Sequence, residues 1–72
     1  MDKLIEVRSD AVSGVAYDPG KNVLTVQFRS GGLYQYDGVP ESLYEDFLAA
    51  QPHPWSECGA EIKRYAFRRV AG

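Results

Sequence analysis

The chain has 72 residues, of which 44% are hydrophobic and 25% charged, and its formal net charge is −2. This length favours a single domain over residues 1–72, and such a domain buries roughly 60% of the surface that its unfolded chain exposes. The composition is that of a folded globular protein and excludes a disordered segment. The negative charge argues against a dedicated nucleic-acid binder, and the apolar runs are too short for a transmembrane helix.

The N-terminus and the cysteine content favour a cytoplasmic location. Met1-Asp2-Lys3-Leu4 lacks the apolar run of a signal peptide. The single cysteine, Cys58, cannot form the disulfides that stabilise small secreted domains. We therefore expect no association with a membrane.

Three strands are predicted in the first half of the chain because β-branched and aromatic residues alternate there with polar ones. An extended segment, Leu4 to Arg8, precedes them. Turn-forming residues separate the strands at Asp18–Asn22 and at Ser30–Gly32. The expected strands are residues 13–17, 23–29 and 33–37.

Two helices are predicted in the second half. Pro40 opens the first, because proline is tolerated in a first turn, and apolar residues then recur at helical spacing. The prolines of Gln51–Pro54 end it, and a short second helix follows Ser56, a favourable N-cap. Residues 66–72 are expected to be extended or frayed. The predicted fold class is α+β, a three-stranded antiparallel β-meander with one amphipathic helix packed on one face and a short C-terminal helix.

Loop length decides which side chains share a face of the sheet, because side chains alternate along a strand. A four-residue first loop, residues 19–22, places Tyr17 opposite Leu24 and Val15 opposite Val26. These residues then form an apolar face for the helix to cover.

The second loop leaves two arrangements open. A two-residue loop, Gly31-Gly32, places Tyr34 opposite Gln27 and Tyr36 opposite Thr25, so both rings lie on the far face as a stacking platform. A three-residue loop that includes Ser30 sends both rings to the core face. In that case the C-terminal segment would cover them.

No motif for chemistry is found. His53 lies between prolines without a partner acid or nucleophile, and Cys58 is expected to be a semi-buried structural residue. No Cys or His pair has zinc-ligand spacing. We therefore expect a protein that is not an enzyme, with no cofactor, no metal and no identifiable small-molecule substrate. Trp55 is expected to pack at the edge of the core.

The order of these segments resembles the KTSC domain, a small bacterial family named from the C-terminus of some lysyl-tRNA synthetases. The resemblance rests on Val12-Ser13-x-Val15-x-Tyr17-Asp18, Leu24-x-Val26-x-Phe28, Gly32-x-Tyr34-x-Tyr36, Val39-Pro40-x-x-x-Tyr44-x-x-x-Leu48, Ile62, Tyr65 and Phe67-Arg68-Arg69-Val70. It covers nearly the whole chain. It implies no defined activity, although attachment to a synthetase suggests RNA as a ligand. Because the chain starts at Met1, we expect a stand-alone domain without synthetase activity.

Two functions follow as hypotheses. The first is a non-catalytic protein-interaction module, which forms a homodimer or binds another protein through a sheet edge. The alternative is an RNA-binding accessory domain, in which Tyr34 and Tyr36 stack on bases and basic residues contact phosphates. The basic residues in that hypothesis are Arg29, Lys63, Arg64, Arg68 and Arg69.

Overall fold

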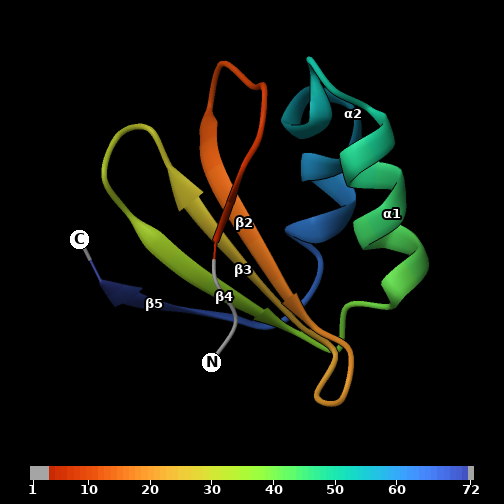
Figure 1. Cartoon of the computed structure of the whole chain (residues 1–72). Coiled ribbons are helices and arrows are strands. Elements are labelled where there is room, and N and C mark those ends of the chain that lie inside the picture. The colour runs from red at the N-terminus through yellow and green to blue at the C-terminus, as the bar shows by residue number, and fades with distance from the viewer. Residues whose placement is uncertain (1–3, 72) are drawn as a thin grey trace.

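The computed structural model describes residues 4–71, which form an α+β fold with one five-stranded antiparallel sheet and two helices (Figure 1). The strands lie side by side in chain order. The α+β class is confirmed, but the predicted number of three strands is wrong. The expected absence of a signal peptide rests mainly on residues 1–3, which lie outside the described residues. The strands are β1 (Ile5–Glu6), β2 (Val12–Asp18), β3 (Val23–Phe28), β4 (Leu33–Asp37) and β5 (Phe67–Ala71).

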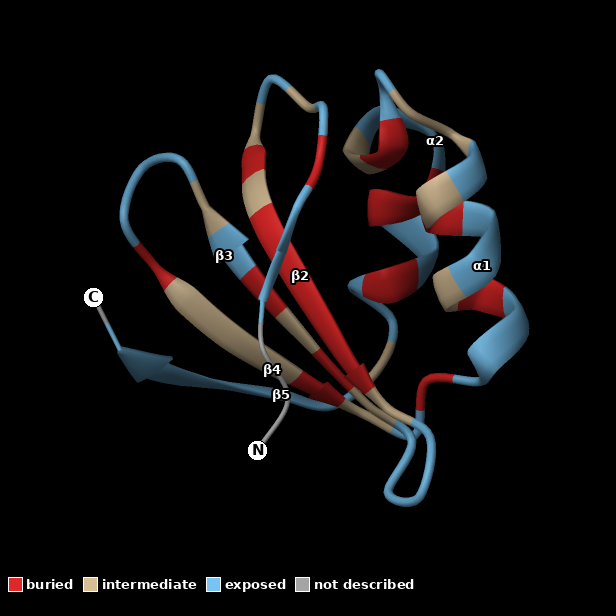
Figure 2. Cartoon of the chain, viewed as in Figure 1, coloured by how far each residue is buried: buried red, intermediate tan, exposed pale blue. Residues whose placement is uncertain are grey.

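Both helices, α1 (Glu41–Ala49) and α2 (Pro54–Ile62), lie on the same side of the sheet (Figure 1). We call the covered side of the sheet the helix face and the other side the open face. The buried residues of the helices, among them Phe47 and Ile62, pack into one core with the sheet (Figure 2). Neither helix, nor any other in the described part of the chain, is long and apolar enough to cross a membrane.

The first hairpin has the predicted register. Val15 pairs with Val26 and Tyr17 with Leu24, and residues 19–22 form the loop. The Asp18 carboxylate accepts hydrogen bonds from the backbone N–H groups of Gly20 and Lys21 at 3.0 and 3.3 Å, which fixes the turn. All four paired residues are buried, so this part of the core follows directly from loop length.

Of the two arrangements that the sequence left open for the second hairpin, the structure has the three-residue loop that includes Ser30. Val26 pairs with Tyr34 and Leu24 with Tyr36, whereas the two-residue loop would have paired these tyrosines with Gln27 and Thr25. The backbone N–H of Phe28 donates to the carbonyl of Gly32 at 2.8 Å, which leaves three residues, 29–31, in the loop. An odd loop length reverses the face of every following side chain. Both tyrosines therefore lie on the helix face, and the predicted platform on the open face does not form.

Helix α1 begins directly after Pro40, as predicted. Helix α2 begins earlier than predicted, because Pro54 occupies its first turn rather than stopping the chain. His53 takes the N-cap position, and Ser56 lies inside the helix. Trp55 packs against the core from the first turn of α2, as expected.

The two strands beyond the predicted three form the edges of the sheet, and β1 lies within the segment 4–8 that was expected to be extended. β1 has only two residues and pairs with β2 through Ile5 and Val15. β5 lies within the tail that was expected to be extended or frayed. It pairs with β4, Phe67 opposite Tyr36 and Arg68 opposite Gln35. The chain after α2 thus completes the sheet.

Candidate functional site

The two tyrosines of the predicted stacking platform are packed within the protein. Tyr36 is 4% exposed, and its ring lies 5.6 Å from Phe67 and 6.5 Å from Trp55. Tyr34 is half-buried and meets Phe28 edge to face at 5.5 Å. Burial raises the pKa of the Tyr36 hydroxyl, with a smaller effect from nearby Tyr34. These contacts are those of core aromatics.

The predicted basic residues are divided between several places. The Arg29 Nε atom donates to the carbonyl of Ser9 at 2.7 Å and so fixes the second hairpin to the segment before β2. The Lys63 ammonium lies 5.7 Å from the centre of the Trp55 ring, in a cation–π contact. Arg64 is exposed just after α2. Only Arg68 and Arg69 are neighbours on one strand, β5.

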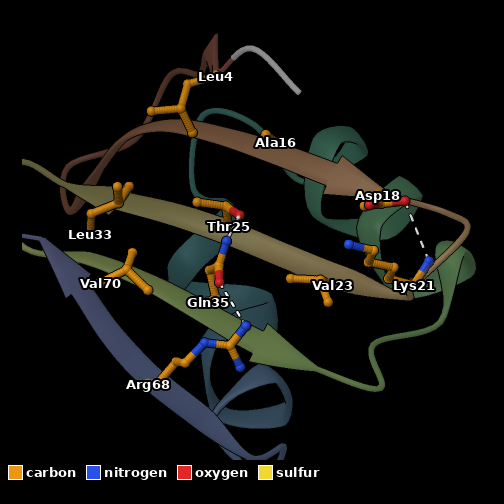
Figure 3. Close-up of a pocket in the computed structure, with 10 residues that line it drawn as sticks. All are labelled: Leu4, Ala16, Asp18, Lys21, Val23, Thr25, Leu33, Gln35, Arg68 and Val70. Atoms are coloured by element: carbon orange, nitrogen blue, oxygen red, sulfur yellow. Dashed lines mark hydrogen bonds between the residues drawn. The ribbon is translucent and has the colours of Figure 1, made fainter. Parts of the chain in front are cut away.

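The open face of the sheet is hollowed to a volume of about 670 Å³ (Figure 3). Strands from both halves of the sheet contribute to it, and Leu4 lies at the opposite side of the hollow from Val70. Its floor is apolar at Ala16 and Val23 and polar at Thr25. The hollow is lined by Leu4, Ala16, Asp18, Lys21, Val23, Thr25, Leu33, Gln35, Arg68 and Val70.

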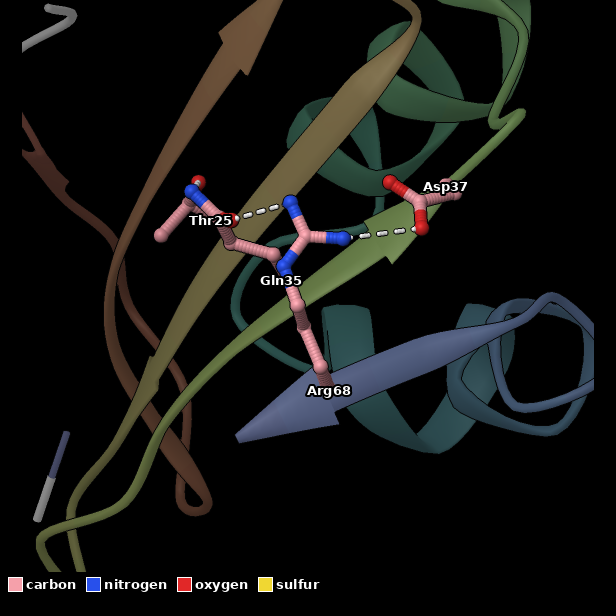
Figure 4. Close-up of polar contacts among 4 residues, drawn as sticks. All are labelled: Thr25, Gln35, Asp37 and Arg68. Atoms are coloured by element: carbon pink, nitrogen blue, oxygen red, sulfur yellow. Dashed lines mark hydrogen bonds and ion pairs between the residues drawn. The ribbon is translucent and has the colours of Figure 1, made fainter. Parts of the chain in front are cut away.

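A row of polar contacts crosses the open face from β3 to β5 (Figure 4). The Gln35 amide donates to the Thr25 hydroxyl at 3.4 Å and accepts from Arg68 Nη2 at 2.8 Å. The other terminal nitrogen of Arg68 donates to Asp37 Oδ2 at 3.0 Å. Both ion-pair side chains are about half exposed, so the pair itself contributes less than about 1 kcal/mol. Its structural effect is to hold the β5 side chain against β4.

Strand β5, at one edge of the sheet, is exposed along its whole length (Figure 2). All five residues are exposed, including Phe67 at 57% and Val70 at 44%. The backbone N–H of Asp37 donates to the carbonyl of Ala66 at 2.8 Å, so Asp37 and Ala66 are a hydrogen-bonded pair between β4 and the start of β5. Because hydrogen-bonded and non-bonded pairs alternate between antiparallel strands, the backbone N–H and C=O of Phe67 point away from β4. The outer edge of β5 thus offers outward-pointing backbone groups and two large apolar side chains.

Cys58 lies within α2 and His53 at the N-cap of that helix, so neither belongs to the sheet. Cys58 is 9% exposed within α2, where burial and nearby carboxylates raise the pKa of its thiol. His53 is exposed at the start of α2. Among residues 4–71, no three His, Cys, Asp or Glu side chains gather as a set of metal ligands.

Phe67 and Val70 were not predicted from the sequence as surface residues. Phe67 was assigned to a segment covering the tyrosines, and its ring does contact both, at 6.0 Å from Tyr34 and 5.6 Å from Tyr36. The signal for a strand was present in Phe67-Arg68-Arg69-Val70-Ala71, which has aromatic and β-branched residues. Two adjacent arginines interrupt the alternation that would have marked it.

The model of the KTSC domain family matches residues 8–53, which include β2, β3, β4 and α1. The chain belongs to the KTSC domain family. Its relatives include a protein from Tsukamurella paurometabola, 38% identical over 45 residues that make up 62% of this chain and 67% of the relative. An uncharacterised protein from Stutzerimonas stutzeri is 35% identical over 48 residues, 67% of this chain and 68% of its own length.

The crystal structure of a KTSC domain protein from Yersinia pestis is similar over almost the whole chain. It is 30% identical, with a TM-score of 0.90 over 99% of this chain and 100% of the Yersinia chain. The similarity therefore extends beyond the family match into α2 and β5. Strand β5 is part of a fold that this KTSC domain shares with the Yersinia protein.

Proposed function

We propose that this KTSC domain is a non-catalytic protein-interaction module, which adds an extended segment of another polypeptide to its sheet along β5. The observation that carries this proposal is the outer edge of β5, with the backbone of Phe67 directed outward and two exposed apolar side chains. An extended peptide gains main-chain hydrogen bonds at such an edge, and alternate side chains supply specificity.

The contrast between the two sheet edges supports the choice of β5. Proteins protect edge strands by keeping them short, charged or irregular. At the opposite edge, β1 has two residues, and the adjacent β2 carries a register irregularity between Val12 and Gly14. β5 is longer, at five residues, and exposes a phenylalanine and a valine, whereas β1 exposes one apolar residue, Ile5. The register of β5 against β4 also shifts, but only between Arg69 and Ala71. Arg68 and Arg69 disfavour pairing of β5 with positively charged strands, but they do not disfavour neutral or acidic ones.

The RNA alternative has less support from the geometry. Stacking on unpaired bases requires aromatic faces open to solvent, and Tyr36 is 4% exposed beneath Phe67 and Trp55. Arg29 donates to Ser9 and Lys63 covers Trp55, so these two cations have structural roles. Strand addition uses the residues that the fold leaves exposed.

Selection from a library of short random peptides displayed on phage tests the proposal. We expect the wild-type chain to enrich peptides that it then binds in solution, as measured by isothermal titration calorimetry. Phe67→Pro removes both the ring and the outward N–H, whereas Phe67→Ala removes only the ring. Proline is tolerated at this point because the lost N–H points away from β4. We therefore expect weaker binding by Phe67→Ala and weaker still by Phe67→Pro.

Circular dichroism and thermal unfolding of both variants serve as the control for folding. Selected peptides that bind the folded Phe67→Pro variant as tightly as the wild type would overturn strand addition at β5. The same holds if their NMR shift changes map to the exposed surface of α1 rather than to β4 and β5.

A further inference from the structure

The side chains of β5 present the same chemistry on both faces of the sheet. Phe67 and Arg69 point to the helix face, as do Tyr36 and Tyr34 opposite them. Arg68 and Val70 point to the open face. Each face therefore offers one apolar residue and one arginine to a strand that pairs with the outer edge.

Neighbours on a sixth strand would meet these four residues in a fixed order. Side chains directly opposite one another lie on the same face, about 4.5–5.5 Å apart at Cβ. Apolar residues fit opposite Phe67 and Val70, and carboxylates fit opposite Arg68 and Arg69. The complementary sequence is apolar–acidic–acidic–apolar, which reads the same in both chain directions. The pattern thus holds for a parallel and for an antiparallel partner.

The charge around β5 favours an acidic partner even though Arg68 already contacts Asp37. The guanidinium has five N–H donors, and the contacts described for Arg68 use two of them. Residues 62–72 contain four basic residues and no acidic one, whereas residues 1–61 contain ten acidic and four basic residues. The basic charge is therefore concentrated at β5 and the segment before it. An approaching carboxylate is attracted there and repelled by most of the remaining surface.

A second copy of this chain fits the edge poorly. The antiparallel register that pairs all five residues of β5 with its own copy places Arg69 directly opposite Arg69 of the other chain. Like charges in that position destabilise a sheet. Charge complementarity thus points away from a β5–β5 dimer and toward a different polypeptide.

We propose that β5 accepts an extended segment with the pattern apolar–acidic–acidic–apolar. This inference rests on the proposed function, because it names the chemistry of the strand that the β5 edge receives. It also assigns paired roles: Phe67 and Val70 select the apolar positions, and Arg68 and Arg69 select the acidic ones.

Three synthetic peptides test the inference, with Val-Glu-Glu-Val, Val-Ser-Ser-Val or Val-Lys-Lys-Val at the centre of the same neutral flanks. Calorimetry should show the acidic peptide binding roughly tenfold tighter than the serine peptide, because two cross-strand charge pairs are gained. The lysine peptide should bind more weakly than the serine peptide. The preference should decrease at high salt, since the charges are exposed.

Charge-matched variants locate the preference on β5. Arg69→Gln should reduce the advantage of the acidic peptide over the serine peptide by about threefold. Arg64→Gln removes the same charge from an exposed residue outside the strand and should leave the advantage nearly unchanged. Equal losses in the two variants would overturn a strand-specific role for Arg69.

The outcomes distinguish a failure of the acidic pattern from a failure of strand addition at β5. Equal binding of all three peptides at β5 would overturn the acidic pattern and leave strand addition supported. Failure of all three to change the NMR signals of β5 would overturn both, as would binding of an oligouridylate at β5 without binding of any peptide. Light scattering that shows a dimer disrupted by Arg69→Glu would also overturn the choice of a foreign partner.

Discussion

At the scale of single residues, Tyr17 connects the sheet to the start of α1. Its hydroxyl donates to the carbonyl of Val39 at 2.6 Å in a buried position. Its ring stacks on Tyr44 of α1 with centroids 4.9 Å apart. Burial and the carboxylates of Glu41 and Asp18 raise the pKa of the hydroxyl. The neutral hydroxyl is therefore the form that the fold requires.

Removing this hydroxyl should destabilise the protein. Tyr17→Phe leaves the Val39 carbonyl buried without its donor, and we expect the free energy of unfolding to fall by about 1–2 kcal/mol. Urea denaturation measures the change. Tyr65→Phe, at a half-exposed position, is the control and should change the same quantity by less than about 0.5 kcal/mol. Equal stability of Tyr17→Phe and the wild type would show that the bond contributes nothing.

Gly59 packs against Trp55 in a contact that could not be predicted from the sequence. Glycine inside a helix is usually unfavourable by about 1 kcal/mol relative to alanine. Here the Trp55 indole lies over it, and a Cβ at Gly59 would be 2.9 Å from the ring. The glycine lets Trp55 lie flat on α2, where it also meets Phe28 and Lys63. Side-chain packing of this kind leaves no periodic pattern in the sequence from which it could be predicted.

At the scale of elements, the loop between β3 and β4 determines which residues are buried. Gly31 has φ of +113°, a conformation that residues with a Cβ rarely adopt. We expect Gly31→Ala to reduce the free energy of unfolding by about 1–2 kcal/mol. Gly20→Ala, at a turn without a positive φ, is the control and should change it by less than about 0.5 kcal/mol. Urea denaturation of both variants tests this, and a neutral Gly31→Ala would contradict the strained loop.

The elements that were predicted correctly are those with local signals. Val23 to Phe28 alternates cleanly, and Pro40 marks a helix start, so β3 and α1 could be placed from sequence. The face on which the β4 side chains lie could not be predicted, because Gly31 and Gly32 each suit a turn. A difference of one residue in loop length moves Tyr34 and Tyr36 to the other face of the sheet. Strand β5 was missed because its partner, β4, lies about thirty residues earlier and its Arg68-Arg69 pair hides the alternation. Pairing between distant segments is settled by tertiary packing.

At the scale of the whole molecule, basic charge is concentrated in residues 62–72, and the fold places this segment along and next to one edge of the sheet. The basic residues of the C-terminal segment end in β5, at one edge of the sheet. The exposed apolar residues Phe67 and Val70 lie on the same strand. Backbone groups, apolar contacts and positive charge therefore coincide at this edge, and the proposed function depends on that coincidence.

Hydrogen exchange of the Phe67 backbone amide, followed by NMR with and without the Val-Glu-Glu-Val peptide, tests the central claim most directly. This amide points away from β4, so we expect it to exchange readily in the isolated chain and to be protected when a sixth strand pairs with β5. The amide of Arg68, which points toward β4, provides the internal reference and should change little. Unchanged exchange at Phe67 in the peptide-saturated protein would contradict strand addition at β5.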